Sequence, residues 1–257
     1  MFSKDARCIY GNNQLADVIC QLRFPEILSI GANLPVDFQE SIRSDYPKFS
    51  VNTEPAPPRA PGSQLSDQNA SVNYQFTSID GVWQVNLTSR FIALACKKYT
   101  CWEDFAKRLD MPLAAFIKLY KPACFERVGL RYMNFFSRVA LDLTDYPFRE
   151  LIEAPYLGLL ADDDVREQTS TRNSLDADIG INGGCRVKLH AGPGRVKRNG
   201  VDDGEVKFIF DQDLYMSGNI PVNYSAGALE TLHSQAYPIF RGAITQLLHN
   251  ALGPETP

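Results

Sequence analysis

The sequence contains few of the residues on which metal centres and acid–base sites depend. Of its 257 residues, three are histidines and six are cysteines. No two cysteines have the C-x2-C spacing with which a tight turn brings two thiolates to one zinc ion, and no G-x-S-x-G motif marks a nucleophilic serine. The sequence therefore gives no support for a structural zinc site or a serine hydrolase, and we predict no bound cofactor.

Long apolar runs are absent as well. Nowhere do about 18 uncharged apolar residues follow one another, as a membrane-spanning helix requires. The start of the chain, Met1-Phe2-Ser3-Lys4-Asp5-Ala6-Arg7, lacks the apolar region of a secretory signal. We therefore expect a cytoplasmic protein with no membrane partner, in which reducing conditions keep the cysteines as free thiols.

The chain carries no excess of positive charge. Its 26 Lys and Arg residues face 30 Asp and Glu residues, which gives a net charge of -4. A hydrophobic content of 44% and a charged content of 22% are typical of folded globular proteins. Because no global cationic field attracts nucleic acid, we expect such a partner only through a local basic segment.

The first half of the chain, residues 1–124, combines strand and helix patterns. Val18, Cys20 and Leu22 alternate with other side chains, which predicts a strand with one apolar face. A helix opened by Pro35 and stopped by Pro47 follows. Further along, the patterns predict a Pro-rich mobile loop at 54–70, strands near 71–79, 82–89 and 91–98, and a helix from about residue 101.

The second half, residues 125–257, repeats this order. Its patterns predict a strand at 125–137, a helical segment at 147–160, strands at 165–181, 184–191 and 205–215, and a long C-terminal helix at 225–250. The first strand of each half carries Leu-Arg-aromatic, as Leu22-Arg23-Phe24 and Leu130-Arg131-Tyr132. We therefore expect an α+β fold, duplicated from two related βαβββα halves whose helices pack on antiparallel sheets. In its element order, this arrangement is analogous to TBP-like or helix-grip folds.

Two sequence blocks resemble a known family. Gln21-Leu22-Arg23-Phe24-Pro25 and Gly129-Leu130-Arg131-Tyr132-Met133-Asn134 are similar to blocks of a sporadically distributed family of uncharacterised bacterial proteins. The function of that family is unknown, so the resemblance carries over no catalytic residue. Its patchy distribution resembles that of mobile defence or toxin-linked cassettes, which implies a role beside a protein partner.

Arg23 and Arg131 are the first candidates for a binding site. Each lies on a strand opposite the apolar face, where a guanidinium suits carboxylates, phosphates or backbone carbonyls. With Gln21 and Asn134 beside them, they would line a surface for an anion or a partner between the halves. The alternative is structural, with each arginine paired to a neighbouring carboxylate or carbonyl.

A second candidate is the basic segment Gly192-Pro193-Gly194-Arg195-Val196-Lys197-Arg198-Asn199-Gly200. Its glycines and its cations Arg195, Lys197 and Arg198 suggest contact with phosphates, yet it lacks both glycine-rich phosphate fingerprints. We predict a long hairpin loop here. Its cations would be the site for a nucleic acid backbone or an acidic partner.

Asp211 and Asp213 are weak candidates for a divalent cation site. Strand alternation places both carboxylates on one side, as a D-x-D metal motif requires. The alternative is the solvated face of a strand end.

These patterns favour a non-enzymatic binding or regulatory protein that acts with a protein partner, with a homo-oligomer also open. A different class is a protein that binds a small ligand or nucleotide in a pocket between sheet and helices. The weakest alternative is a metal-dependent enzyme using Asp211 and Asp213.

Overall fold

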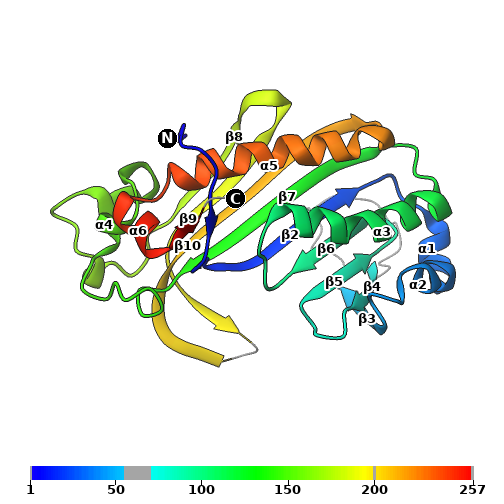
Figure 1. Ribbon diagram of the computed structural model, residues 1–257, viewed down its shortest axis with the longest axis horizontal. Coiled ribbons are helices and arrows are strands. Elements are labelled where there is room, and N and C mark those ends of the chain that lie inside the picture. Colours follow the sequence, from blue (N-terminus) through cyan, green and yellow to red (C-terminus); the bar gives the residue numbers. More distant parts are fainter. Residues whose placement is uncertain (1, 55–70, 199–200, 256–257) are drawn as a thin grey trace, which may run out of the picture.

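The computed structural model describes residues 2–54, 71–198 and 201–255. These residues form a nine-stranded sheet in which every neighbouring pair of strands is antiparallel (Figure 1). The strands follow the order β3 (Lys48–Glu54), β4 (Ser71–Thr77), β5 (Trp83–Leu87), β6 (Phe91–Cys96), β2 (Leu15–Arg23), β7 (Phe125–Phe136), β10 (Val201–Ile220), β9 (Arg186–Arg198) and β8 (Leu175–Gly180). The first strands of the two halves, β2 and β7, therefore pair at the centre of one continuous sheet.

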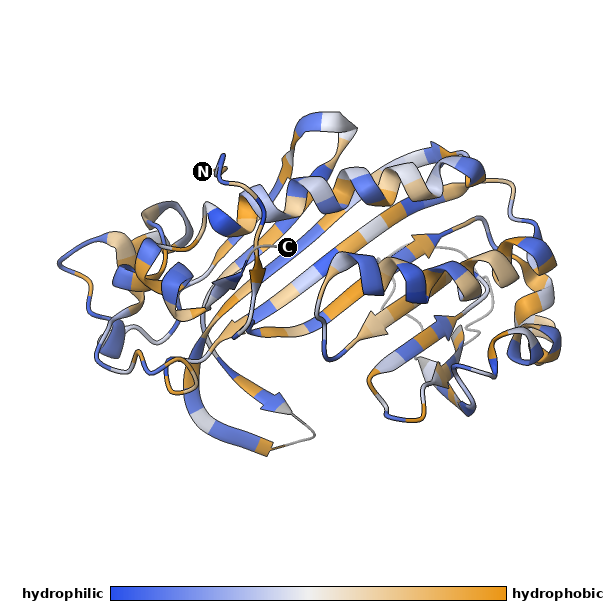
Figure 2. Ribbon diagram, in the orientation of Figure 1, coloured by the Kyte–Doolittle hydropathy of each residue, from blue (hydrophilic) through white to orange (hydrophobic). Residues whose placement is uncertain are grey.

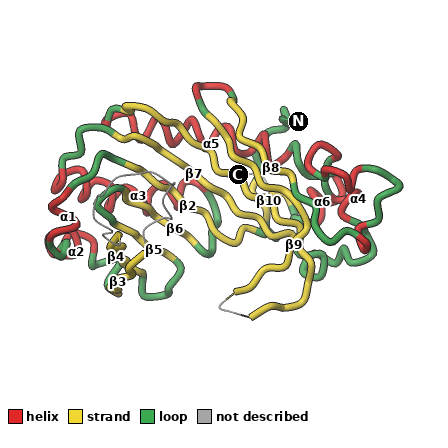
Figure 3. The backbone as a smooth tube through the Cα atoms, turned by 180° about the vertical axis from the view of Figure 1, so that it is seen from behind, coloured by secondary structure: helices red, strands yellow, loops and turns green. Residues whose placement is uncertain are grey.

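Two long helices cover one face of the sheet. Helix α3 (Trp102–Tyr120) contacts β6, and α5 (Ser225–Arg241) contacts β7 and β10. Figure 3, seen from behind, shows the strands in front of both helices. We call this uncovered side the open face. The shorter helices are α1 (Leu28–Ala32), α2 (Val36–Ile42), α4 (Phe148–Leu151) and α6 (Gln246–Ala251), and 3-10 turns lie at 154–156, 158–161, 167–169, 182–184 and 222–224.

Strand alternation decides which side chains face the helices. On β2, Val18, Cys20 and Leu22 are fully buried, whereas Arg23 at the strand end is exposed. The same period of two appears along the other central strands, where hydrophobic and hydrophilic residues alternate (Figure 2). The α+β class with antiparallel pairing, expected from this periodicity, is confirmed.

One hydrophobic core joins both halves. In the first half, the ring centroid of Phe24, just after β2, lies 4.6 Å from that of Phe116 in α3. In the second half, Tyr156 packs edge-on against Phe210 of β10. All four side chains are almost fully buried, and burial of a side chain of this size contributes about 1.5–3 kcal/mol to stability. The sheet and its two long helices thus share one core.

The N-terminal segment crosses the helix-covered side. We call residues 3–13 the N-terminal strap; it contains β1 (Ile9–Tyr10), which pairs with β11 (Pro254–Glu255) near the other end of the chain. Ser3 N donates to Pro238 O at 2.9 Å, which holds the strap against α5 (Figure 1). Arg7 reaches Glu103 of α3 at 2.9 Å. The strap therefore contacts the long helix of each half.

Several predicted elements have different bounds in the structure. Strand β3 was not predicted, although Lys48-Phe49-Ser50-Val51 alternates polar and apolar residues as a strand does. Together with β1, it brings the described strands of the first half to six, against four in the expected βαβββα order. The Pro-rich segment at 54–70 lies, apart from Glu54 at the end of β3, outside the described residues.

The second half departs further from its predictions. The helical segment expected at 147–160 is reduced to α4 and two 3-10 turns, because Pro155 and Gly158, at φ +57°, interrupt it. Of the strand expected at 165–181, only β8 forms. The predicted C-terminal helix ends at Arg241 and restarts as α6, with Thr245 as the N-cap that accepts a bond from Leu248 N. No helix of the described residues is long and apolar enough to cross a lipid bilayer.

Candidate functional site

The predicted site residues lie on both faces of the sheet. Arg131 and Gln21 belong to the open face, on neighbouring strands, while Asn134 is 2% exposed and faces the helices. Arg23 is opposite Arg127, and Arg131 is opposite Ile19. Because Arg23 and Ile19 are four residues apart, about 13 Å separates the two arginines along the strand direction. The structure therefore does not bring all four residues into one site.

Arg131 pairs with a carboxylate of the next strand. Its Nε donates to Asp211 Oδ1 at 2.8 Å and its second nitrogen binds Asp211 Oδ2, an arrangement that raises the pKa of Arg131. Arg127 binds both carboxylate oxygens of Asp213, at 2.7 and 2.8 Å. On β8 and β9, Arg186 also pairs with an aspartate of the neighbouring strand, donating from Nε to Asp178 Oδ1 at 3.0 Å and from a second nitrogen to the Asp178 backbone oxygen at 3.2 Å. These bidentate contacts favour the structural alternative for Arg131.

The same contacts occupy the two aspartates of the D-x-D motif. Asp211 and Asp213 do share one face of β10, as strand alternation predicts, but each carboxylate is already paired with an arginine guanidinium. Within the described ranges, no group of three or more His, Cys, Asp or Glu side chains is arranged to hold a metal ion. The geometry therefore favours a cross-strand charge ladder, in which β7 is basic and β10 is acidic.

The basic segment is a strand rather than the predicted hairpin loop. Residues 192–198 belong to β9, and β10 begins already at Val201, so the two strands form a long arm beyond the sheet. Glycines 192 and 194 stand opposite Ile209 and Lys207 in regular pairing and form no phosphate-binding loop. The physical reason is the length of β10, whose first residues remain extended and provide a partner for this segment.

The cations of this arm face acidic or apolar partners. Lys197 is opposite Asp202 and Arg195 is opposite Val206; both cations are exposed, while only the backbone of Arg198 is described. Near the base of the arm, Glu205 accepts bonds from Ser137 Oγ at 2.8 and 2.9 Å. The arm therefore carries charges of both signs.

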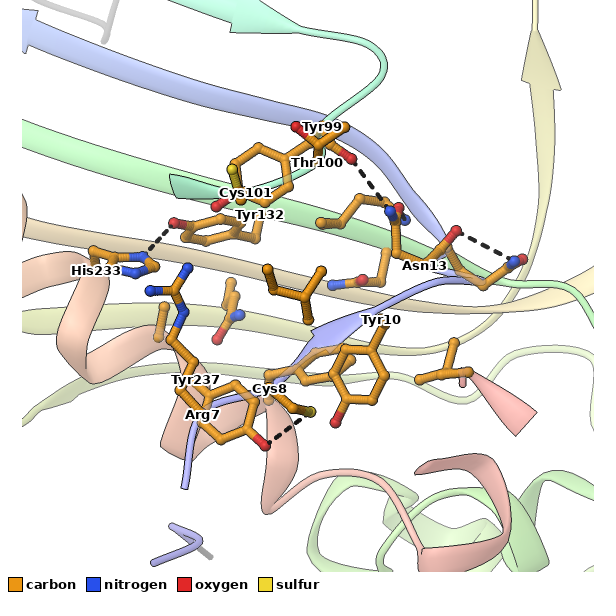
Figure 4. A pocket seen from close by; sticks show the side chains of 18 residues that line it. Arg7, Cys8, Tyr10, Asn13, Tyr99, Thr100, Cys101, Tyr132, His233 and Tyr237 are labelled. Atoms are coloured by element: carbon orange, nitrogen blue, oxygen red, sulfur yellow. Dashed lines mark hydrogen bonds between the residues drawn. The ribbon is translucent and has the colours of Figure 1, made fainter. Parts of the chain in front are cut away.

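A cleft lies on the helix-covered side, where β7, β10, α5, the strap and residues 99–101 just before α3 meet. Its volume is about 100 Å³. Figure 4 shows side chains of the strap, of residues 99–101, of β7 and of α5 around it. It is lined by Arg7, Cys8, Ile9, Tyr10, Asn13, Gln14, Leu15, Tyr99, Thr100, Cys101, Tyr132, Asn134, Gln212, His233, Ala236, Tyr237, Phe240 and Leu252.

The floor of the cleft follows from strand register. Tyr132 of β7 is directly opposite Gln212 of β10, and Asn134 is opposite Phe210. Alternation points Tyr132, Asn134 and Gln212 towards the helices, into positions that apolar residues occupy elsewhere on these strands. Above them, Ala236 of α5 has a side chain too small to fill the space. The polar side chains of the floor therefore lie beside the space that Ala236 leaves open.

His233 forms one wall of the cleft and is neutral. Its ring stacks on Trp102 with centroids 4.6 Å apart, and its Nδ1 lies 3.0 Å from the hydroxyl oxygen of Tyr132. Burial, with a smaller contribution from the nearby Arg7 cation, lowers the pKa of His233 to about 4. Because burial also raises the pKa of Tyr132 well above its usual value, the pair carries no charge at neutral pH.

Arg7 brings a cation to the rim, but Glu103 neutralises it. The guanidinium donates to both carboxylate oxygens of Glu103, at 2.9 and 3.3 Å. This pairing lowers the pKa of Glu103 to about 2 and raises that of Arg7. The strap and α3 are therefore joined at the cleft by an ion pair.

Gln212 carries a polar atom that is left without a hydrogen bond. The residue is 2% exposed, and its buried Oε1 accepts no hydrogen bond in the described structure. Neighbouring Asn134 donates its Nδ2 to Phe210 O at 3.5 Å, which is long for a hydrogen bond. An unpaired buried acceptor costs about 1–3 kcal/mol, so the site is incomplete without a donor.

Sequence reasoning found one residue of this cleft, Asn134, and missed Gln212. The sequence did contain a signal for Gln212, because it occupies a buried position of β10 in alternation with Phe208, Phe210 and Leu214. A polar residue in that register must either find a partner in the core or leave an unpaired group.

Two comparisons with known proteins give no match. No protein-family model matches the chain, and no curated protein is similar enough to match it. The resemblance to a family of uncharacterised bacterial proteins stays a prediction. Arguments about function therefore depend on the geometry of the site.

Proposed function

We propose that this protein is a non-enzymatic binding protein of the cytoplasm, which holds a small ligand in the cleft between the sheet and its helices. The observation that carries the proposal is the unpaired, buried Oε1 of Gln212 in the floor of an open cleft. A ligand with a hydrogen-bond donor would complete this site and remove the cost of the unpaired acceptor.

The position of the cleft favours a regulatory role. Tyr132 and Gln212 come from two sheet strands, while Tyr99 lies just before α3 and His233 lies on α5, so segments of both halves border one space. A ligand here would contact both halves of the chain and stabilise their packing by mass action. The cleft presents no unpaired charge to such a ligand, since His233 is neutral and Arg7 is paired with Glu103.

A variant whose side chain fills the cleft tests whether a ligand binds there. Ala236 is 4% exposed and borders the cleft, so Ala236→Phe places a ring in the space that a ligand would occupy. We expect a fragment screen by ligand-observed NMR to detect binding to the wild type and none to this variant. Ala226→Phe makes the same change at an exposed position of α5 and should bind as the wild type does. Equal binding by all three proteins would contradict the proposal.

A second candidate function is the binding of a protein partner through the β9–β10 arm. The pairing of β10 with β7 ends at Phe208 and Phe136, so residues 201–207 of β10 continue away from the sheet. Figures 1 and 3 both show this hairpin leaving the body of the protein. Val201 is 69% exposed there, and Arg195 and Lys197 are exposed as well. A projecting hairpin with apolar and charged residues offers a partner both contact area and orientation.

Replacing residues 194–207 by an Asn-Gly turn removes the arm and leaves the paired part of the sheet. In affinity purification from the source organism, the partner hypothesis expects one protein that the wild type retains and the arm-deleted variant loses. Equal recovery of that protein with both would assign its contact to another surface, such as the open face.

We also propose that the two halves arose by duplication. In support, each half contributes one strand to the centre of the sheet, β2 or β7, and each of these pairs with a later strand of its own half, β6 or β10. A long helix, α3 or α5, then follows in each case. This arrangement is compatible with the analogy to TBP-like and helix-grip folds, and with the resemblance to a family whose patchy distribution resembles that of mobile defence or toxin-linked cassettes.

A further inference from the structure

The size of the cleft limits what it encloses. Its volume is about 100 Å³, while an engineered protein cavity of about 150 Å³ accepts benzene. One five- or six-membered ring is therefore the largest group that this space encloses. A sugar or phosphate attached to such a ring would remain outside the floor residues.

The walls of the cleft are aromatic and suit a flat ring. Tyr99 and Tyr132 meet edge to face, with ring centroids 5.8 Å apart and planes at 88°. Tyr10, Tyr237 and Phe240 also border the space, and Figure 4 shows Tyr10, Tyr132 and Tyr237 from three different segments around it. Aromatic faces and edges placed at such angles favour a planar guest by stacking and edge contacts.

The charges of the cleft exclude an ionised guest. Among the eighteen lining residues, Arg7 is the one side chain charged at neutral pH, and Glu103 binds it through both oxygens. His233 is neutral. An anion or cation in this space would lose its hydration without gaining a free counter-charge, which is costly.

Gln212, in the floor of the cleft, requires a ligand that donates a hydrogen bond. Gln212 Oε1 can accept hydrogen bonds but accepts none in the described structure. A ring without an N–H or O–H would leave it unpaired, while a ring that carries a donor would satisfy it. The Asn134 carboxamide, with its long bond to Phe210 O, lies on the same face of the neighbouring strand.

From these four constraints we infer that the ligand is a neutral planar heterocycle with a ring N–H, of the size of a pyrimidine base, whose N–H donates to Gln212 Oε1. This inference depends on the proposed binding function and specifies its ligand class.

Two probes of similar ring size provide the test. Uracil carries ring N–H donors, and pyrimidine has the same six-membered ring without them. In titrations followed by NMR, we expect uracil to bind the wild type at least tenfold more tightly than pyrimidine does. Equal affinities would overturn the role of the N–H.

Gln212→Met removes the acceptor at similar volume. We expect this variant to lose uracil binding at least tenfold while its unfolding midpoint in urea stays equal to that of the wild type or rises, because an unpaired buried acceptor has been replaced by an apolar group. Gln21→Met is the matched control on the open face and should bind uracil as the wild type does. Unchanged binding by the Gln212 variant would contradict the inference.

The experiments distinguish a wrong ligand class from a wrong binding function. If uracil does not bind but the fragment screen detects another ligand that Ala236→Phe abolishes, the binding function stands and the ligand class is wrong. If neither uracil nor any fragment binds, both are wrong.

Discussion

Trp102 and His233 lie ring on ring, with centroids 4.6 Å apart and planes 9° apart. Trp102 is the first residue of α3, and its Nε1 donates to Glu230 of α5 at 2.8 Å. The stack and the hydrogen bond thus join the two long helices, α3 and α5, directly beside the cleft. Binding in the cleft and packing between the helices consequently involve the same residues.

The first prediction concerns this helix contact. Trp102→Ala removes a 5%-exposed ring and leaves His233 without its stacking partner. We expect a loss of about 3–5 kcal/mol in the free energy of unfolding, measured by urea denaturation. Trp102→Phe keeps a ring at this position and should lose less. A loss below 1 kcal/mol for the alanine variant would mean that the contact between α3 and α5 contributes little.

The second prediction is a pH dependence caused by His233. Burial lowers its pKa from 6.5 to about 4, so between these values the unfolded chain binds a proton that the folded protein does not. Stability from this group is therefore fully present above pH 6.5 and falls as the pH decreases towards 4. Each pH unit in that window costs about 1.4 kcal/mol, which gives about 3 kcal/mol over the whole window.

Urea denaturation at several pH values tests this dependence by comparing wild type with His233→Gln. The difference in unfolding free energy between the two proteins should change across pH 6.5 to 4 and stay constant above pH 7. A difference that does not vary with pH would show that His233 is not buried in its neutral form.

The third prediction separates a structural from a binding role for Arg131. Its partner Asp211 has a side chain only 14% exposed, so Arg131→Ala leaves a largely buried carboxylate unpaired. We expect a cost of about 1–3 kcal/mol, and a coupling of about 1 kcal/mol in a double-mutant cycle with Asp211→Ala. An unchanged melting temperature would instead favour a binding role on the open face.

The fourth prediction compares two glycines of the same sheet. A Cβ on Gly192 would lie 2.4 Å from the backbone oxygen of Asn173, whereas a Cβ on Gly180 would meet nothing within 4 Å. Gly192→Ala must therefore displace backbone and should lower stability by about 1–3 kcal/mol. Gly180→Ala should be neutral or stabilise by up to about 1 kcal/mol. Thermal unfolding of both variants checks this, and equal effects would contradict the close approach at Gly192.

Local periodicity predicted much of the fold, because alternation and turn signals are encoded in neighbouring residues. The strands that became β2, β4, β5, β6 and β7 were expected within a few residues of their observed bounds. The β9–β10 arm was not predicted, because the residues around Gly192 do not themselves show that β10, later in the chain, is long enough to pair with them. Likewise, Gly192 and Gly194 suggested a loop, yet regular pairing with β10 holds them in a strand.

The candidate site was harder to predict than the fold. The pairs Arg131–Asp211 and Arg127–Asp213 depend on the register between β7 and β10, which are more than 70 residues apart in sequence at these pairs. The cleft depends in addition on the path of the strap across α5. Only the placement of Gln212 in the buried register of β10 was accessible from sequence, and it carries the central claim.

That claim is that the cleft beneath Ala236 is a ligand site completed at Gln212. A crystal structure of the protein soaked with uracil tests it most directly. The account predicts a planar ring between Tyr132 and the strap, with a ring nitrogen within about 3 Å of Gln212 Oε1. Density for ordered water alone at that atom, in crystals soaked to saturation, would contradict it.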